Sequence, residues 1–336
     1  MSNKSNEGNN NIMIIEENSN RLVTNEIELA NMLNNHYVNI VEKSSGEKPI
    51  SIDLQTAEDN YDVIRNIISN FKDHESIVKI MENCPSSQIS FQFQELSSAD
   101  VKKLFSEVNF NASAGEDGIS PKLSKIAGKY LVESLTHAIN SSIRKSYFPN
   151  RAKLASVTPL DKGSKNKTTM GNFRPVSVLN FFSKFYEKAM KNQLMTYFEN
   201  KVSPFLSAYR KNYSTQHVLL RLLEQWKEKL DLGYTVGAVL MDLSKAFDCV
   251  PHDLIIAKLH AYGLGMTALE FILSYLTNRY QRTKVNTTFS SFEKIVSGVP
   301  QGSILGPVLF IHQLTLHCWK HTEMAGKDWR FDTKQR

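Results

Sequence analysis

The most restrictive feature of the sequence is a short apolar run that ends in a carboxylate. Residues 235–241 are nearly all apolar, and Asp242 follows them directly. Seven residues without polar alternation predict a strand that is buried on both faces. A carboxylate at the end of such a strand is costly unless it is paired or binds a metal ion, and Mg²⁺ prefers oxygen ligands of this kind. A lone Asp here can also cap the next turn, so both roles stay open for Asp242.

Composition favours a soluble protein inside the cell, in the nucleus or the cytoplasm. The 336 residues are 41% hydrophobic, which suffices for one large domain or two ordinary ones. No run of about 18 apolar residues is present, so we expect no membrane-spanning helix. Residues 1–20 are rich in Asn and Ser and lack a signal-peptide core. The three cysteines have no C-x-x-C spacing, which argues against a disulfide scaffold and a zinc site.

Charge is distributed unevenly along the chain. Residues 1–100 carry 7 basic and 16 acidic side chains, whereas the remainder carries 33 basic and 18 acidic ones. A basic block beside an acidic one indicates a polyanionic partner for the basic part. A solvated basic surface without a partner is the alternative.

Hydrophobic periodicity predicts a mixture of helices and strands. Residues 1–20 show no periodicity and are predicted to be disordered. Helices are predicted over residues 22–44, 62–81, 180–200, 215–230 and 251–263, and from residues 98, 121 and 267 onward. Strands are predicted over residues 89–93 and 155–160, and a hairpin over residues 282–296. Thr24 is the expected cap of the first helix, and Thr267 with Glu270 fits a capping box.

Two basic residues flank a polar loop over residues 161–169. Lys162 and Arg174 could clamp a triphosphate, because Arg supplies a planar fork of donors and Lys a point charge. A solvated basic loop explains the pair equally well. Further on, Gln301 lies between Pro300 and Gly302, where a turn would place backbone amides and an amide side chain on one edge. Taken alone, Phe247 is more typical of a core residue than of a selectivity element.

The order of several short motifs is more specific than any one of them. In chain order they are Gly115-Glu116-Asp117-Gly118, Val157-Thr158-Pro159 with Lys162, Phe173-Arg174-Pro175-Val176-Ser177, Ala208-Tyr209-Arg210 with Ser214-Thr215, Met241-Asp242-Leu243-Ser244-Lys245-Ala246-Phe247-Asp248, and Gly298-Val299-Pro300-Gln301-Gly302. This series resembles the reverse transcriptase of non-LTR retrotransposons, and most of all the jockey-like LINE group. The resemblance covers roughly residues 91–310, and residues 22–44 are similar to the linker that precedes the polymerase in those elements.

The resemblance implies the α+β fold of a right-hand polymerase. Residues 21–97 are then expected to be a mostly helical linker upstream of the polymerase. Residues 98–310 are expected to form the fingers and a partial palm, and residues 311–336 a divergent tail that resembles nothing in the family. The implied activity is RNA-directed DNA synthesis, with an RNA template, a DNA primer and deoxynucleoside triphosphates as partners.

The resemblance also assigns roles to single residues. Asp242 matches the first catalytic aspartate, which binds both Mg²⁺ ions with help from the Leu243 carbonyl. Phe247 matches the steric gate that excludes a 2′-hydroxyl. The remaining matches concern the nucleotide: Lys162 and Arg174 hold its triphosphate, while Gln301 and Gly302 support it and the template base. Asp248 is typical of the group but is not expected to bind metal, and Asp242 is expected to lie near Gln301.

The sequence departs from the family pattern after Phe310. The aromatic-Ala-Asp-Asp motif expected there is missing, and no Asp-Asp pair occurs anywhere in the sequence. The thumb and the amino-terminal endonuclease of these elements are also missing from it. A two-metal phosphoryl transfer cannot be supported by one carboxylate, so the resemblance predicts a chain truncated within the palm and defective in catalysis. The alternatives are a nucleic-acid-binding remnant and a non-functional fragment of a decayed element.

Overall fold

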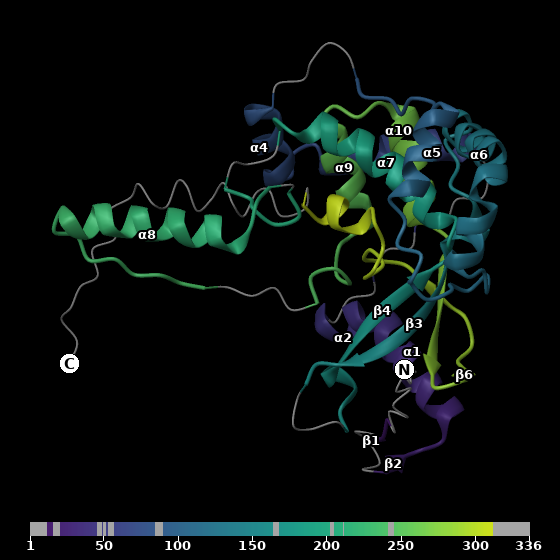
Figure 1. Ribbon diagram of the computed structural model, residues 1–336. Helices are drawn as coiled ribbons and strands as arrows, with labels where there is room; N and C mark the ends of the chain where they lie inside the picture. The colour runs from purple at the N-terminus through teal and green to yellow at the C-terminus, as the bar shows by residue number, and fades with distance from the viewer. Residues whose placement is uncertain are drawn as a thin grey trace, which may run out of the picture.

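The computed structural model is an α+β structure in which a small sheet lies below a block of helices (Figure 1). It describes residues 12–15, 21–45, 49, 52, 57–84, 90–163, 168–201, 205–210, 212–240 and 245–311. The predicted α+β fold class is confirmed. Within these ranges, no helix is long and apolar enough to cross a membrane.

The sheet is built from segments far apart in the sequence. Its strands are β3 (Leu154–Asp161), β4 (Phe173–Leu179), β5 (Arg279–Val285), β6 (Thr288–Phe289) and β7 (Glu293–Ile295). Their order is β4-β3-β5-β6, and β7 pairs with β5. Strand β3 is antiparallel to β4 and parallel to β5, so that Val157 lies opposite both Ser177 and Thr283. The predicted strand at 155–160 and the predicted hairpin at 282–296 are both present.

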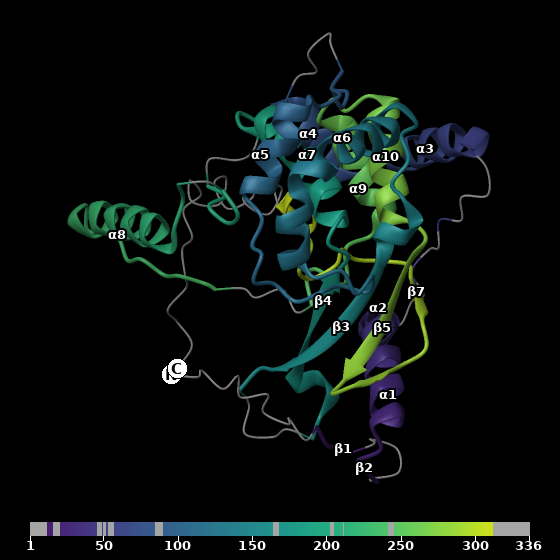
Figure 2. The same ribbon diagram turned by 45° about the vertical axis from the view of Figure 1, so that its right-hand side comes forward.

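One face of the sheet is covered by helix α1 (Glu26–Val38), as Figure 2 shows beside β5. The buried apolar side chains on the helix are Leu29, Ala30, Leu33 and Tyr37, and they pack with Val157, Phe173 and Val285 of the sheet. The helix is capped by Asn25 rather than by the predicted Thr24, because the Asn25 side chain accepts the backbone N–H groups of Ile27 and Glu28, both at 3.1 Å. Helix α2 (Ile40–Ser45) follows directly.

A two-stranded ribbon lies beside α1. It consists of β1 (Ile14–Ile15) and β2 (Leu22–Val23), and Ile14 is fully buried. This part of residues 1–20 therefore differs from the predicted disorder, because its two isoleucines alternate between a buried and an exposed face.

The helices of the upper block share one hydrophobic core. They are α3 (Ala57–Phe71), α4 (Glu75–Asn83), α5 (Ser98–Ser106), α6 (Pro121–Arg144), α7 (Ser183–Phe198), α9 (His252–Ala261) and α10 (Met266–Leu276). The single helix predicted over 62–81 is two helices, because His74 caps a new start by accepting the N–H of Ser76.

Two other local predictions in this block were wrong. The predicted strand over residues 89–93 is, among its described residues, only an isolated bridge between Phe91 and Leu264. Helix α10 has Gly265 at its N-cap and no side-chain cap. The expected capping box is absent because Thr267 donates instead to Gln92, and Glu270 accepts from the Asn60 side chain.

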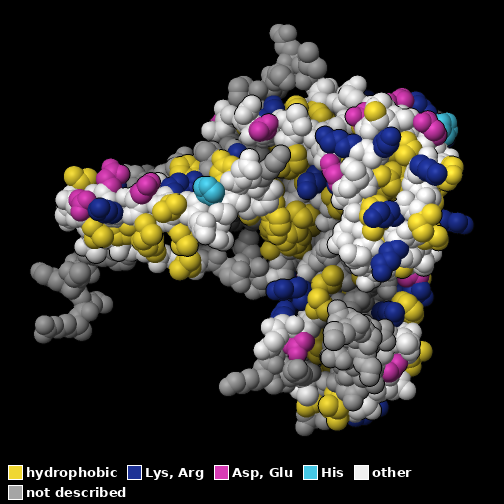
Figure 3. Space-filling view, in the orientation of Figure 1, with side chains coloured by type: hydrophobic (Ala, Val, Ile, Leu, Met, Phe, Trp, Pro, Cys, Tyr) yellow, Lys and Arg dark blue, Asp and Glu magenta, His cyan; other side chains and the backbone are white. Residues whose placement is uncertain are grey.

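Helix α8 (Thr215–Asp231) extends away from the rest of the molecule (Figure 1), and none of its residues is buried. Figure 3 shows hydrophobic side chains gathered along it. The chain then continues over residues 234–240 without regular structure, and Leu240 is 96% exposed. The prediction of a buried strand over residues 235–241 was therefore wrong for 235–240. A strand buried on both faces needs neighbours on its hydrogen-bonding edges, and no described strand pairs with this segment.

Candidate functional site

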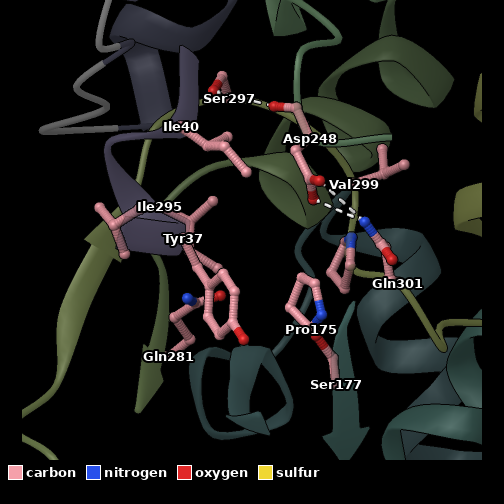
Figure 4. Close-up of a pocket in the computed structure, with 13 residues that line it drawn as sticks. Tyr37, Ile40, Pro175, Ser177, Asp248, Gln281, Ile295, Ser297, Val299 and Gln301 are labelled. Atoms are coloured by element: carbon pink, nitrogen blue, oxygen red, sulfur yellow. Dashed lines mark hydrogen bonds between the residues drawn. The ribbon is translucent and has the colours of Figure 1, made fainter. Parts of the chain in front are cut away.

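Three of the sequence motifs meet at the turn around Gln301. The Gln301 carbonyl oxygen accepts the N–H of Ser177 at 2.7 Å, which ties the turn to strand β4. The Gln301 side-chain Nε2 donates to both carboxylate oxygens of Asp248, at 3.0 and 2.8 Å (Figure 4). Segments that are far apart in the sequence are thus joined through one glutamine, whose side-chain amide is held in a fixed orientation.

Two glycines allow this close approach. Gly302 has a φ of +113°, and a Cβ there would lie 2.6 Å from the Ser177 carbonyl oxygen. Gly298 has a φ of +76°, and a Cβ there would lie 2.5 Å from the Asp248 carbonyl oxygen. Both positions combine a left-handed backbone with no room for a side chain, so glycine is required at each.

Asp248 is a partly buried carboxylate among basic groups. Burial raises its pKa, while the hydrogen bonds from Gln301 and the charges of Lys245 and Lys162 act in the opposite direction. The sequence indicated only that Asp248 is typical of the jockey-like LINE group that the motifs resemble. In the structure it is the residue that orients Gln301.

A second carboxylate binds the backbone that follows the Gln301 turn. Glu187 of α7 is fully buried, and one of its oxygens accepts the N–H groups of Ile304 and Leu305, at 2.6 and 3.0 Å. Its other oxygen accepts from the Ser183 hydroxyl at 3.0 Å. Burial raises the pKa of Glu187, and the charge of Arg279 is the largest opposing effect.

Sequence reasoning missed Glu187. A signal was present, because the residue lies at helical spacing with Met190 and Leu194 on the buried stripe of α7. An acidic residue on an apolar stripe is expected to have a buried partner.

The two predicted phosphate ligands lie at the open end of the β3–β4 pair. The Lys162 ammonium donates to the Gly171 carbonyl oxygen at 2.7 Å, and its charge reaches Asp248. Arg174 is exposed on β4 opposite Leu160. Because side chains alternate along a strand, Arg174 faces away from the side on which Pro175 and Ser177 lie. The structure thus brings Lys162, but not Arg174, toward the Asp248 side of the sheet.

Phe247 lies in an aromatic group. Its ring stacks on Phe310 with centroids 4.3 Å apart and meets the edge of Tyr209 at 6.1 Å. Its carbonyl oxygen accepts the N–H of Val299 at 2.9 Å, which also anchors the turn. This packing agrees with a core role, and the steric gate stays a prediction.

The predicted metal ligands Asp242 and Leu243 lie outside the described residues, as does the expected proximity of Asp242 to Gln301. Where the structure does describe the chain, no three His, Cys, Asp or Glu residues are grouped closely enough to hold a metal ion. The Mg²⁺ site therefore stays a prediction.

A cavity of about 40 Å³ lies between helix α1 and the Gln301 turn. Figure 4 shows Tyr37 and Ile40 on one side and Pro175, Asp248 and Gln301 on the other. Helix α1, which the sequence placed in a separate linker, therefore forms one wall of the candidate site.

Comparison with known proteins gives consistent matches. The family model described as reverse transcriptase (RNA-dependent DNA polymerase) matches residues 162–316. The RNA-directed DNA polymerase from mobile element jockey of Drosophila melanogaster is 30% identical over 227 residues, which cover 66% of this chain and 24% of the relative. The probable RNA-directed DNA polymerase from transposon BS of the same species is 27% identical over 233 residues, or 66% and 25% of the two chains.

A shorter match involves another kind of element. The retrovirus-related Pol polyprotein from type-1 retrotransposable element R2 of Popillia japonica is 37% identical over 78 residues, which cover 23% of this chain and 13% of the relative. The chain spans about a quarter of the length of the jockey and BS relatives.

Proposed function

Because the chain belongs to the reverse transcriptases of jockey-like non-LTR retrotransposons, we propose that its described part holds the incoming nucleotide during RNA-directed DNA synthesis. The substrates are deoxynucleoside triphosphates, with an RNA template and a DNA primer. The observation that carries the proposal is the junction of Gln301 with Ser177 and Asp248, which builds one rigid polar edge from three motifs.

Different residues around this edge bind different parts of the nucleotide. Lys162 and Lys245 provide positive charge beside Asp248, which favours a bound triphosphate. The fixed Gln301 amide offers hydrogen bonds to the nucleoside, and Gly302 allows the turn that carries it to lie against strand β4. Arg174, exposed on the other side of β4, would reach a triphosphate only from the rim.

Reverse transcriptases generally use divalent metal ions. We propose Asp242 and the Leu243 carbonyl as ligands of Mg²⁺, which supplies charge stabilisation for phosphoryl transfer. Phe247 is proposed as the gate beneath the sugar, with its ring held from behind by Phe310.

A second candidate function is nucleic-acid binding without chemistry. It is favoured by one observation, namely the excess of basic side chains after residue 100, which number 33 against 18 acidic ones.

One assay separates the two candidates. Primer extension on an RNA template is measured with Mg²⁺ for the chain and for Asp242→Asn, and binding of labelled RNA is followed by fluorescence anisotropy at several salt concentrations. Extension that is lost in Asp242→Asn supports the polymerase. Salt-sensitive binding in the range of about 10⁻⁴–10⁻⁶ M without extension supports the second candidate. If neither primer extension nor RNA binding is detected, both candidate functions are contradicted.

A matched pair of variants locates the binding surface. Alanine at Lys162, Lys165, Lys167 and Arg174 should weaken RNA binding and flatten its salt dependence, because fewer counterions are released. Alanine at four exposed lysines of the α6 region removes the same charge elsewhere; they are Lys122, Lys125, Lys129 and Lys145. If both variants lose affinity equally, only net charge matters and the basic loop has no special role.

A further inference from the structure

The Ala208-Tyr209-Arg210 motif carries an exposed aromatic side chain beside the predicted steric gate. Tyr209 is 53% exposed, and its ring meets the ring of Phe247 with centroids 6.1 Å apart and an angle of 82° between the two planes. Phe310 stacks on Phe247, which nevertheless stays only partly buried. Two rings at nearly a right angle form a corner, with Phe247 as its floor and Tyr209 as its wall.

The backbone on both sides of this corner is strained. Six non-glycine residues in the described part of the chain have a positive φ, and three of them are asparagines, which tolerate that conformation. Tyr209, with a φ of +57°, and Lys245, with a φ of +55°, are two of the other three. Lys245 begins the turn that carries Phe247, because its carbonyl oxygen accepts the N–H of Asp248 at 3.0 Å. Strain of this kind is concentrated at sites that bind substrates, where the surrounding structure holds it in place.

The loop that carries Tyr209 is held by other side chains. Arg221 of α8 donates to the Phe205 carbonyl oxygen at 3.1 Å, and its guanidinium group lies over the Phe205 ring. Arg210 donates to the Leu206 carbonyl oxygen at 3.2 Å. These hydrogen bonds do not involve the Tyr209 side chain, so its ring is available to a ligand.

A deoxyribose suits such a corner better than a ribose. Its 2′ carbon carries only hydrogens, and C–H groups pack well against aromatic rings. The 2′-hydroxyl of a ribose would lose water at the ring surfaces without gaining a hydrogen bond from them, which costs free energy. Beside a floor alone, the sugar could shift sideways to make room for the hydroxyl, whereas a wall at right angles to the floor blocks that movement.

We propose that Tyr209 is a specificity-determining residue: its ring closes the side of the corner at Phe247 and helps to exclude nucleotides that carry a 2′-hydroxyl. This inference rests on the proposed function, in which Phe247 lies beneath the sugar of the incoming nucleotide. It gives a role to the motif at residues 208–210, which the proposed function leaves without one.

The test measures nucleotide binding in the absence of chemistry. The full chain is assembled with Mg²⁺ on an RNA template and a DNA primer that ends in a dideoxynucleotide, and dGTP and GTP are titrated separately opposite a template cytosine. The readout is the ratio of the two dissociation constants, and wild type should prefer dGTP. Tyr209→Ala should lower this preference about 10-fold, mainly by admitting GTP, as expected for the loss of a steric contact in a binding pocket. Tyr209→Phe keeps the ring and should restore the wild-type preference.

Two further variants locate the effect. Tyr213→Ala removes a neighbouring ring that is 42% exposed and packs on Arg210 instead of Phe247, so the preference for dGTP should not change. Phe247→Ala should lower the preference, because it removes the gate itself.

The outcomes separate this inference from the proposed function. If Tyr209→Ala keeps the preference while Phe247→Ala loses it, the inference is overturned and the proposed function stands. Equal weakening of dGTP and GTP binding in Tyr209→Ala also overturns it, because that result indicates a structural role. A loss of preference in Tyr213→Ala does the same, since the loop as a whole would then set the preference. If wild type binds both nucleotides equally, there is no gate for Tyr209 to complete and the inference fails. If wild type binds neither, the proposed function itself fails and the inference with it.

Discussion

Helices α10 and α8 both contain several leucines, yet α10 is buried and α8 is exposed. Of the eleven residues of α10, nine are buried, among them the charged Glu270. Helix α8 carries Leu219, Leu220 and Leu223 with 57–60% of each side chain exposed. Composition explains part of the difference, because α8 carries six charged residues and α10 only one, Glu270.

The neighbours of the two helices differ as well. Helix α10 packs against α3 and α9, and its Ser274 hydroxyl accepts the N–H of Phe148 at 3.0 Å. Helix α8 contacts no comparable surface within the described residues. Apolar periodicity thus predicts that a helix exists, whereas burial depends on what the rest of the fold places beside it.

The largest effect on the free energy of unfolding is expected in the upper block of helices, at Glu187. Glu187→Ala leaves two backbone N–H groups and the Ser183 hydroxyl without their acceptor in a buried place. We expect a loss of about 3–5 kcal/mol in the free energy of unfolding, measured by urea denaturation. Glu187→Gln retains an acceptor and should lose clearly less. Equal losses for the two variants would mean that the negative charge of Glu187, and not a neutral acceptor of the same size, stabilises the turn.

A core truncation in α10 should have the next largest effect. Ile272 is fully buried, and Ile272→Ala removes packing and leaves a cavity. The expected loss is about 3 kcal/mol in the same denaturation experiment, within the usual 2–5 kcal/mol for such changes. A loss below about 1 kcal/mol would show that α10 is not held as the structure describes.

Helix α1 is an intermediate case, because only one of its sides is covered. The titration of His36 reports whether the helix is packed against the sheet. Burial, followed by the charges of Lys43, Lys245 and Lys162, lowers the pKa of His36 from 6.5 to about 4. The unfolded chain takes up this proton near pH 6.5 and the folded chain only near pH 4, so stability falls as the pH falls through that window. Between pH 7 and 5, wild type should lose about 1 kcal/mol more than His36→Gln, which is less than the full shift implies because solvent screens the charges around a partly exposed side chain. Parallel pH profiles would place His36 in solvent and α1 away from the sheet.

The smallest effect is expected on α8. Leu223→Ala removes an exposed side chain, so the free energy of unfolding should change by no more than about 0.5 kcal/mol. Hydrogen exchange provides a second readout, since amides of α8 should exchange much faster than those of α10. A loss of 2 kcal/mol or slow exchange would show that α8 packs against a surface in solution, and the contrast with α10 would disappear.

Local signals in the sequence predicted many elements well. Pro121 marks the first residue of α6, and the strand expected at 155–160 corresponds to β3. These elements depend on rules that act within a few residues, such as the fixed φ of proline and the alternation of side chains.

The failures concern features that depend on distant partners. Residues 235–240 have the composition of a buried strand, but no described strand lies beside them. The site was predicted in part: Gln301 and Gly302 lie where the motifs meet, while the contribution of Tyr37 could not be predicted because nothing local relates it to a turn so far along the chain. Glu187 was missed because one acidic residue in a helix is normally a surface residue.

The parallel pairing of β3 with β5 has a consequence for how the protein folds as it is synthesised. Strands β3 and β4 are close in sequence and can pair early, whereas β5 (Arg279–Val285) is made much later. Helix α1 (Glu26–Val38) packs against β3, β4 and β5, and its Asn34 bonds to Gln281, Thr283 and Ser291. Contacts of such high sequence separation form slowly. We expect the apolar face of α1 to stay incompletely covered on the ribosome until β5 has emerged, which makes the nascent chain a substrate for chaperones.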